Sequence, residues 1–395
     1  MKSSPIPIPL PNPSLKITIL QGAFLPVPPL RGGAVEKLWF QFGQIFQESG
    51  HSVVHISRSY PGLPSEQIIS GVKHIRVSGF DMPANFLLVK LFDLLFSFRA
   101  LFALPHADIL VTNTFWMPLL LFPCPHARGR IVVSVERMPK GQMRFYRHVA
   151  ILRCCSSAVR DRLLKEAPFL ANKTIVVANP LPFQLVESAN PYSKQNIILY
   201  CGRLHPEKGL DLLLRAYIFA CHQGLQGWSL HLVGPYDVSA GGGGSTWFRE
   251  LQAMASSGPG SIHFLGPIYD EHMLHAEYQK ASIFAYPSLA ESGEAMGLAP
   301  LEAMAFGAVP LVSSLACFTD FIAHDTNGVV FDHRSRDPVS ALASSLLSLS
   351  SDPPRLNRLS SEALLVRQTH HPRRIAQQML ECFRDICPSD TNAAL

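Results

Sequence analysis

Two basic side chains, Arg203 and Lys208, stand five residues apart in the segment CGRLHPEKGL. The segment directly follows the apolar run NIILY, and a helical pattern comes next. We therefore expect both cations at the carboxyl end of a strand, beside a helix N-terminus that favours anions. Arginine offers a planar fork of donors and lysine a point charge, so the pair suits a diphosphate; a solvated surface pair is the alternative.

Two glutamates, Glu294 and Glu302, bracket seven residues farther along the chain. The apolar run before them predicts a strand that ends near Ser288, followed by a loop and a helix with Pro300 near its first turn. Glu302 is then expected in that first turn, where the helix dipole favours a carboxylate. The dipole alone would be enough to explain a glutamate at this position. The alternative is that Glu302 grips the vicinal hydroxyls of a sugar while Glu294 faces the group that a diphosphate carries.

The bulk composition bounds what the chain can be. Its 395 residues predict two domains, and 47% hydrophobic against 16% charged residues excludes a disordered or coiled-coil chain. Residues 1–190 hold 20 Lys and Arg against 10 Asp and Glu, a net of +10, and the remainder holds 14 against 19, a net of −5. The basic half suits an anionic membrane surface or a phosphorylated substrate, and nucleic acid ranks lowest without a nucleic-acid motif.

Short apolar runs alternate with helical patterns along most of the chain. Residues 15–20 and a run from His51 predict strands around an amphipathic helix, and four more strands follow up to Asn179. A proline-rich polar stretch then predicts a linker, and a second βα rhythm starts near residue 196. We expect two doubly wound α/β domains, 1–188 and 189–372, with a helix within 373–395 that packs back on the first, and a site in a cleft between them.

Several segments bear on location and on partners. The proline-rich N-terminus is a poor signal peptide, the eight cysteines have no framework spacing, and a cytoplasmic location is expected, with the inner face of the membrane as a peripheral contact. Charges interrupt the apolar run 86–104, which favours a buried helix over a surface-lying amphipathic one and argues against a membrane span. A basic cluster could hold anionic headgroups or be a solvated helix face; it comprises Lys140, Arg144, Arg147 and Arg153.

Three motifs in the same order resemble one known family. E-x7-E followed by AMAFGAVPLVSS is similar to the signature of retaining glycosyltransferases of family 4, which have the GT-B fold. The segment GRLHPEKGLDLLLRAY resembles their diphosphate-binding segment, and PLRGGAVEKLWFQFGQIFQESGHSV their N-terminal glycine loop. The resemblance covers nearly the whole chain. It implies two Rossmann-like domains that face a central cleft.

The resemblance implies a role for each matching residue. Arg203 and Lys208 would bind the donor's diphosphate, Glu302 the nucleotide ribose and Glu294 the hydroxyls of the transferred sugar. Gly32 and Gly33 would form a loop that closes over the phosphates. The remaining residues of the predicted donor site are Gly202, Gly297 and Leu298.

This chain departs from the family at two places. Glu136 stands after the run IVVSV, where relatives commonly carry histidine, and it either contacts the sugar or acceptor or forms a structural salt bridge to Arg137 or Arg144. Ala295 and Met296 stand where Gly and Phe are usual, which would change the fit of the sugar. The run Gly241–Gly244 lacks the ending of a P-loop and favours a mobile loop over a phosphate cradle.

We therefore predict a retaining hexosyltransferase that moves a sugar from a nucleotide-sugar to a glycan, lipid-linked or small-molecule acceptor, in cell-surface polysaccharide or glycolipid synthesis. No metal and no cofactor beyond the nucleotide-sugar co-substrate are expected. A nucleotide-sugar epimerase and a catalytically silent nucleotide-sugar-binding module remain as alternatives. The donor base, the donor sugar and the acceptor are left open.

Overall fold

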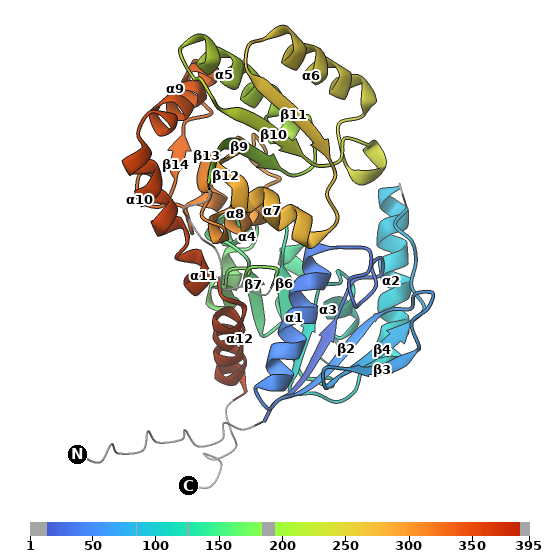
Figure 1. Cartoon of the computed structure of the whole chain (residues 1–395). Coiled ribbons are helices and arrows are strands. Elements are labelled where there is room, and N and C mark those ends of the chain that lie inside the picture. Colours follow the sequence, from blue (N-terminus) through green and yellow to red (C-terminus); the bar gives the residue numbers. More distant parts are fainter. Residues whose placement is uncertain (1–13, 84, 125, 184–193, 388–395) are drawn as a thin grey trace, which may run out of the picture. The chain divides into compact units, whose positions relative to one another are not determined.

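A computed structural model describes residues 14–83, 85–124, 126–183 and 194–387 in two compact units (Figure 1). Unit 1 comprises Met1–Cys155, Arg160–Pro182 and Pro372–Leu395, and unit 2 comprises Ser156–Val159 and Phe183–His371. The chain thus enters unit 2 near residue 183 and returns to unit 1 at its C-terminal helix. The boundary expected at residue 188 lies outside the described residues.

Unit 1 is built on an eight-stranded sheet with the order β3-β4-β2-β1-β5-β6-β7-β8. All neighbouring strands are parallel except β3, which runs antiparallel to β4 at the edge. The strand order reverses between β1 and β5, where Ile17 pairs with both Val53 and Ile109. The strands are β1 Lys16–Leu20, β2 Ser52–Arg58, β3 Glu66–Ile69, β4 Val72–Val77, β5 Ile109–Thr112, β6 Arg130–Val135, β7 Ile151–Cys154 and β8 Thr174–Val176.

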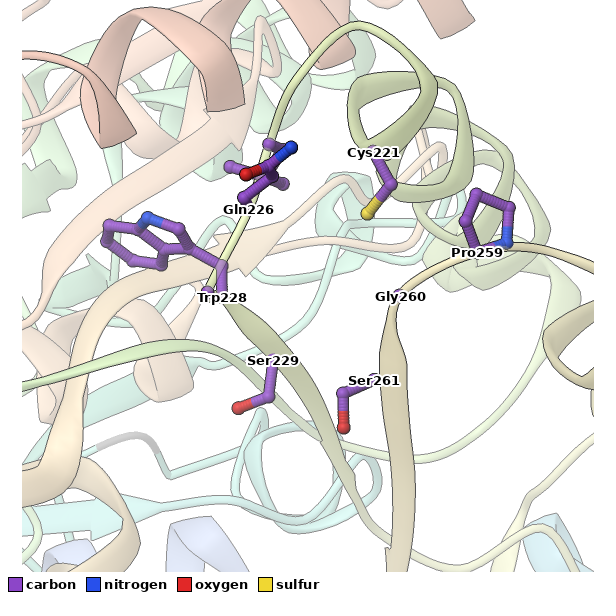
Figure 2. Close-up of a pocket in the computed structure, with 9 residues that line it drawn as sticks. Cys221, Gln226, Trp228, Ser229, Pro259, Gly260 and Ser261 are labelled. Atoms are coloured by element: carbon purple, nitrogen blue, oxygen red, sulfur yellow. The ribbon is translucent and has the colours of Figure 1, made fainter.

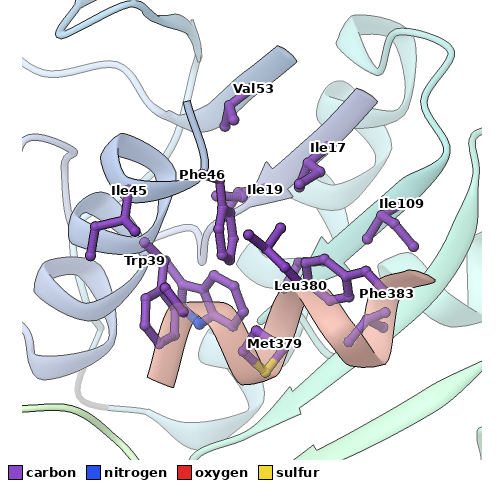
Figure 3. Packing of buried hydrophobic residues seen from close by; sticks show 14 of the residues in the cluster. Ile17, Ile19, Trp39, Ile45, Phe46, Val53, Ile109, Met379, Leu380 and Phe383 are labelled. Atoms are coloured by element: carbon purple, nitrogen blue, oxygen red, sulfur yellow. The ribbon is translucent and has the colours of Figure 1, made fainter. Parts of the chain in front are cut away.

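A C-terminal helix completes the core of unit 1 (Figure 3). Helix α12 turns an apolar stripe of Met379, Leu380 and Phe383 toward the core that α1 and β1 supply, and the Phe383 ring lies 5.8 Å edge-on from that of Phe46. A helix remote in sequence therefore belongs to the first hydrophobic core. The helices of this unit are α1 Ala34–Glu48, α2 Phe86–Ala103, α3 Met117–Leu120, α4 Ser157–Glu166, whose first three residues are grouped with unit 2, and α12 Pro372–Ile386.

Unit 2 is built on a six-stranded parallel sheet with the order β11-β10-β9-β12-β13-β14. Every residue of β12 is buried, as expected for a strand covered on both faces. The strands are β9 Gln195–Cys201, β10 Ser229–Val233, β11 Ser261–Gly266, β12 Ala281–Tyr286, β13 Val309–Ser313 and β14 Val329–Phe331. The helices are α5 Leu210–His222, α6 Ser245–Ser257, α7 Glu271–Lys280, α8 Leu298–Ala305, α9 Pro338–Ser350, α10 Pro353–Ala363 and α11 Val366–Thr369.

The pairing of β9 with β12 decides which loops of unit 2 meet. The sheet order reverses at this pair, and parallel strands end at the same edge, so the segments after Cys201 and after Tyr286 lie together. These are the segments in which Arg203, Lys208 and the two glutamates were found. Topology alone thus brings the predicted donor residues of unit 2 to one edge of its sheet.

Two expectations about helices were wrong. Helix α8 begins at Leu298, so Glu302 is its fifth residue and lies beyond the first turn, where the dipole effect is weaker. Helix α2 was expected to be buried, yet a row of its apolar side chains is exposed, with Phe102 at 76%. The buried side of α2 is small and includes Asp93 and Ser97, because apolar residues occur on both faces of this helix.

Candidate functional site

The loops after β9 and β12 are joined through main-chain contacts. The N–H of Leu289 donates to the carbonyl of Glu207 over 2.8 Å. Gly209, at the junction between the 3-10 turn Pro206–Lys208 and α5, has φ +70°, and a Cβ there would lie 2.1 Å from the carbonyl oxygen of Pro287. Only glycine combines this left-handed conformation with so close an approach. The glycine therefore lets the turn that carries Lys208 pack on the end of β12.

Lys208 and Glu294 form a buried ion pair in these loops. Lys208 Nζ lies 2.7 Å from Glu294 Oε2, and the side chains are 9% and 10% exposed. The same carboxylate oxygen accepts from the Ser288 hydroxyl at 3.0 Å and from the Tyr286 hydroxyl at 3.4 Å. Burial raises the pKa of Tyr286 well above its usual range, so this phenol stays a protonated donor. A lysine and a glutamate 86 positions apart are thus held at one polar point in an apolar setting.

Arg203 lies closer to solvent, with its side chain 46% exposed. Its Nη1 donates to the carbonyl of Gly241 at 2.8 Å and its Nη2 to Glu207 Oε1 at 3.0 Å. The Gly202 that precedes it fits only as glycine, since a Cβ would lie 2.9 Å from the Tyr200 hydroxyl. Arg203 is therefore held in a defined place by a neighbouring loop and a partly exposed carboxylate.

The glycine run 241–244 is a structured support for Arg203. Each of its four N–H groups donates to a backbone carbonyl, over 2.8 to 2.9 Å. The acceptors are the carbonyls of Val238, Asp237, Leu204 and Tyr236. A phosphate cradle needs free N–H groups, so the run cannot act as one in this conformation.

The start of α8 and Glu302 belong to the segment that follows β12, as Glu294 does. The Tyr278 hydroxyl donates to Glu302 Oε2 over 3.2 Å. Gly297 is the N-cap of α8, and a Cβ there would lie 2.5 Å from the Phe318 ring, which keeps the loop close to the core. The first N–H groups of a helix have no acceptor within the helix, so Leu298 and Ala299 present donors at this end, while Pro300 has none.

In unit 1, Glu136 is part of a closed polar network at the ends of β6 and β7. Its Oε1 pairs with Arg153 and accepts from Ser134, and its Oε2 accepts from the Asn179 side chain at 3.0 Å. Arg153 is fully buried and also donates to Asn179 Oδ1 at 2.6 Å and to the Ala178 carbonyl at 2.7 Å.

The ion-pair partner of Glu136 is thus Arg153. The sequence had suggested Arg137 or Arg144 instead. The physical reason is strand register: β6 and β7 are parallel neighbours, and Ser134 pairs with Arg153 one step before the strands end. Because Arg153 is fully buried, it also does not belong to an exposed basic cluster. The other three members of that cluster, Lys140, Arg144 and Arg147, are exposed.

The glycine loop before α1 has a left-handed backbone conformation. Gly32 and Gly33 have φ +75° and +97°, and a Cβ on Gly33 would lie 2.2 Å from Glu36 Oε2. The Glu36 carboxylate thus lies against the N-terminus of its own helix, and burial raises its pKa. An anion at the N-terminus of α1 would therefore lie next to the Glu36 carboxylate. Glu36 was not among the residues predicted from the sequence.

A shallow pocket elsewhere in unit 2 does not share this chemistry (Figure 2). It lies where β10 and β11 begin, at Ser229 and Ser261, the opposite ends of the strands from the Lys208–Glu294 pair. Its thiol, Cys221, has a pKa raised by burial, which makes it a poor nucleophile. The carboxyl edge of the sheet remains the candidate site of unit 2.

Other residues at these strand ends were missed from the sequence. Ser288 and Tyr286 in unit 2 and Asn179 in unit 1 all contact a predicted carboxylate. Each is a polar residue in the last positions of an apolar strand or just after it, and that position was the available signal. Within the described residues, no group of three His, Cys, Asp or Glu side chains is placed to hold a metal ion, and no helix has the length and apolarity to cross a membrane.

Comparisons with known proteins bear on the chemistry of this site. Residues 184–365 match the family model of glycosyl transferases group 1. Glycogen synthase 2 of Methylococcus capsulatus is 27% identical over 182 residues, and a glycogen synthase of Thermus thermophilus is 29% identical over 136 residues. These alignments cover 44% and 34% of this chain, and the chain spans only 35% and 28% of the length of these relatives.

Solved structures match over nearly the whole chain. Sucrose-phosphate synthase from Thermosynechococcus elongatus has a TM-score of 0.73 at 18% identity, over 94% of this chain and 99% of that one. HepE from Anabaena, solved with UDP and glucose, has a TM-score of 0.68 at 16% identity, over 94% and 100%. The catalytic domain of starch synthase IV from Arabidopsis thaliana, bound to ADP and acarbose, has a TM-score of 0.65 at 15% identity, over 95% and 100%.

Together the comparisons confirm the expected fold, and the family match covers most of the residues grouped in unit 2. The matched residues include the Lys208–Glu294 pair, Arg203 and Glu302. The chain therefore has the GT-B fold, and its residues 184–365 are similar to the family of glycosyl transferases group 1.

Proposed function

We propose that this protein transfers a sugar from a nucleotide-sugar to an acceptor hydroxyl with retention of anomeric configuration. The observation that carries the proposal is the buried Lys208–Glu294 pair at the switch point of the unit 2 sheet. Ligands of open α/β sheets bind at this edge, and the pair combines a cation for phosphate with a carboxylate for hydroxyls. Solved structures of similar fold that contain UDP with glucose, or ADP, support the same donor class.

The donor's diphosphate would contact Lys208, Arg203 and the N–H groups of Gly297 and Leu298. Arg203 can rotate its partly exposed guanidinium toward a phosphate because its carboxylate partner, Glu207, is also solvent-accessible. Lys208 is buried and preoriented, so its donation loses little side-chain entropy when the donor binds. Gly32 and Gly33 keep, as part of the proposal, the phosphate-loop role that the resemblance implies.

The two glutamates would divide the remaining recognition. Glu302, with one oxygen bonded to Tyr278, would accept from the ribose hydroxyls. Glu294 would accept from hydroxyls of the transferred sugar while it holds Lys208 in place. A carboxylate that binds both a sugar and the lysine beside the diphosphate would couple the position of the sugar to that of the leaving group.

In the proposed reaction, the bond between the anomeric carbon and the leaving phosphate oxygen breaks, and the acceptor oxygen bonds to that carbon on the same face. The acceptor's proton passes to the leaving phosphate oxygen, so no protein nucleophile is required. Negative charge grows on the diphosphate as the bond breaks, and Lys208 and Arg203 stabilise it there. The chain's main contribution is thus a fixed set of donors at the leaving group.

Glu136, in this proposal, positions other groups. Both of its carboxylate oxygens are engaged, one by Arg153 and Ser134 and the other by Asn179. Three donors already use most of the acceptor capacity of this carboxylate. We therefore assign Glu136 to holding the ends of β6 and β7 together. For the acceptor, we propose a glycan, a lipid-linked molecule or a small molecule in cell-surface polysaccharide or glycolipid synthesis.

A ligand screen followed by a transfer assay tests the proposal. UDP-, GDP- and ADP-sugars are compared by thermal shift, and a donor at 100 times its Kd should add about 2.7 kcal/mol of stability. Lys208→Ala should lose most of this donor-dependent shift, whereas Lys280→Ala, which removes a partly exposed lysine of the same unit, should keep it.

The donor that shifts the wild type is then incubated with and without acceptor sugars. Transfer only in the presence of acceptor supports the proposal. Conversion of the donor alone would indicate an epimerase, and binding without any turnover would indicate a binding module. No shift with any of the three donor classes would contradict the assignment of the Lys208–Glu294 pair to a donor.

A further inference from the structure

Helix α2 of unit 1 presents a continuous apolar stripe to solvent. The stripe side chains recur every three or four residues and are between 40% and 76% exposed. They are Leu88, Leu91, Leu95, Phe98 and Phe102. Positions with this spacing lie on one face of a helix, and the buried residues Asp93, Phe96 and Ala100 lie on the opposite face. Contiguous exposed apolar surface of this kind marks an interaction site.

A basic loop is connected to the helix through the segment that contains Phe115 and Trp116. Within residues 137–147, the exposed residues Arg137, Lys140, Arg144 and Arg147 surround Phe145, which is 50% exposed. The Tyr146 hydroxyl of this loop donates to the Phe115 carbonyl over 3.0 Å.

The segment that holds this loop is itself fixed to α2. Lys90 Nζ of α2 lies 3.9 Å from the centroid of the Phe115 ring, and the N–H of Phe115 donates to Asp93 over 3.0 Å. The Trp116 ring donates to the Lys90 carbonyl over 2.9 Å. The apolar stripe and the basic loop are thus parts of one connected structure.

The charge around the stripe selects its occupant. Asp93 is the only acidic residue in α2, and it is buried, while Arg99 flanks the stripe on the exposed side. The basic loop, residues 137–147, contains four cations and no acidic residue. A second copy of this chain would bring like charges together, whereas an anionic bilayer combines an apolar interior with negative headgroups. No helix in the described part of the chain qualifies as a span, so α2 would lie along the surface.

We propose that the apolar stripe of α2 and the basic loop 137–147 form a docking surface for an anionic lipid bilayer. Phe98 and Phe102 would enter the boundary between headgroups and acyl chains, and Arg144 and Arg147 would remain among the headgroups. This inference concerns unit 1 and goes beyond the proposed transfer reaction. Its test requires no donor and no turnover.

Co-sedimentation of the full chain with vesicles tests this surface. Wild type should bind phosphatidylcholine vesicles that contain phosphatidylglycerol, remain in solution with phosphatidylcholine alone, and bind less as salt rises. The stripe variant Leu91→Gln with Leu95→Gln and Phe98→Gln should lose about tenfold or more in partitioning. Arg144→Gln with Arg147→Gln should lose about 25-fold at low salt, since each cation near such a surface contributes about fivefold.

Matched variants on unit 2 control for lost apolar area and lost charge. Phe219→Gln removes an exposed phenylalanine from α5, and Arg215→Gln with Arg249→Gln removes two exposed arginines. Both should bind like wild type, and thermal unfolding should show that every variant is folded. Equal binding by the folded stripe variant would overturn the proposal. So would failure of wild type to bind either vesicle, or a dimer of the full chain that the stripe variant abolishes, which would assign the stripe to a second copy.

Discussion

Two buried ion pairs, one in each unit, lie at the carboxyl ends of parallel strands and differ in how they are enclosed. The pair Glu136–Arg153 joins β6 and β7 in unit 1, and Arg153 has no exposed surface. The pair Glu294–Lys208 lies beside β9 and β12 in unit 2, and both side chains keep about a tenth of their surface exposed. Arg153 donates to four different groups, whereas the Lys208 ammonium has one carboxylate partner.

This difference favours a structural role for the first pair and is compatible with the reactive role that we propose for the second. A guanidinium spreads its charge over a fixed fork and suits a permanent network, whereas an ammonium is a compact charge that can be shared with an incoming anion. Loss of one partner from an enclosed pair leaves an unpaired buried charge, which chiefly affects folding. We therefore expect substitutions in the first pair to reduce stability and substitutions in the second pair to reduce donor binding and turnover.

The largest expected effect is that of Arg153→Met. Removing this guanidinium leaves the Glu136 carboxylate buried without its cation, and the free energy of unfolding should fall by about 3–5 kcal/mol. Urea unfolding of the purified protein measures the loss. Adding Glu136→Leu to Arg153→Met should restore a large part of it, because the unpaired charge is then gone. If the single variant were as stable as wild type, the pair would have no structural role.

The second effect should appear in catalysis. Lys208→Met removes the donor that we place at the leaving diphosphate, and the rate should fall by about 10² to 10³, equivalent to about 3–4 kcal/mol. Initial rates with saturating donor and acceptor measure it on protein shown to be folded. Lys280→Met, which changes a partly exposed lysine of unit 2, should leave the rate unchanged. Wild-type turnover by the folded Lys208 variant would remove this lysine from the mechanism.

The third effect asks whether acid weakens unit 1 through groups other than its ion pair. Burial, with the nearby Arg76, lowers the pKa of His74 from 6.5 to about 4, and burial, with His74 and Arg76, also lowers the pKa of His55 well below its usual range. Both are neutral in the folded protein and gain a proton on unfolding below about pH 6.5. Stability from His74 is thus fully present above that pH and is lost as pH falls toward 4, by up to about 3 kcal/mol.

Urea unfolding at several pH values between about 4 and 7 measures this slope. His74→Phe should make the dependence shallower, because one fewer proton is taken up on unfolding. A matched variant, His106→Phe, replaces a histidine outside this buried stack and should leave the slope as in wild type. Identical slopes for wild type and His74→Phe would show that the buried histidines do not govern acid stability.

The fourth effect concerns the packing that positions Lys208. Gly209→Ala places a Cβ 2.1 Å from the Pro287 carbonyl, whereas Gly227→Ala, at the similar φ of +73°, meets open space. In both variants a left-handed alanine should lower the free energy of unfolding by about 1–2 kcal/mol. Only Gly209→Ala must also shift the turn beside Lys208. Thermal unfolding and turnover should therefore fall more for Gly209→Ala. Equal losses in both assays would mean that the close approach to Pro287 is unimportant.

Sequence patterns predicted the sheets and the position of the candidate donor residues at the strand ends, because both depend on local order. Buried strands are short apolar runs, and parallel strands end at one edge, so Arg203, Lys208 and Glu294 could be placed there before the structure was known. The partner of Glu136 could not be placed, because it depends on the register between β6 and β7. That register brings Arg153, 17 positions along the chain, next to Glu136. The exposure of α2 was also missed, since composition does not tell which face of an apolar helix the sheet covers.

The smallest expected effect concerns the exposed ion pair next to the site. Glu207→Gln removes the carboxylate that Arg203 contacts at 3.0 Å, and because both side chains are partly exposed to solvent, stability should change by at most about 0.5 kcal/mol. The same change frees the guanidinium from its anionic competitor while the Gly241 carbonyl still positions it. Donor Kd measured by titration should therefore stay the same or decrease, in contrast to the increase expected for Arg203→Gln. A weaker donor affinity for Glu207→Gln would mean that the carboxylate, by orienting Arg203, belongs to the donor site itself.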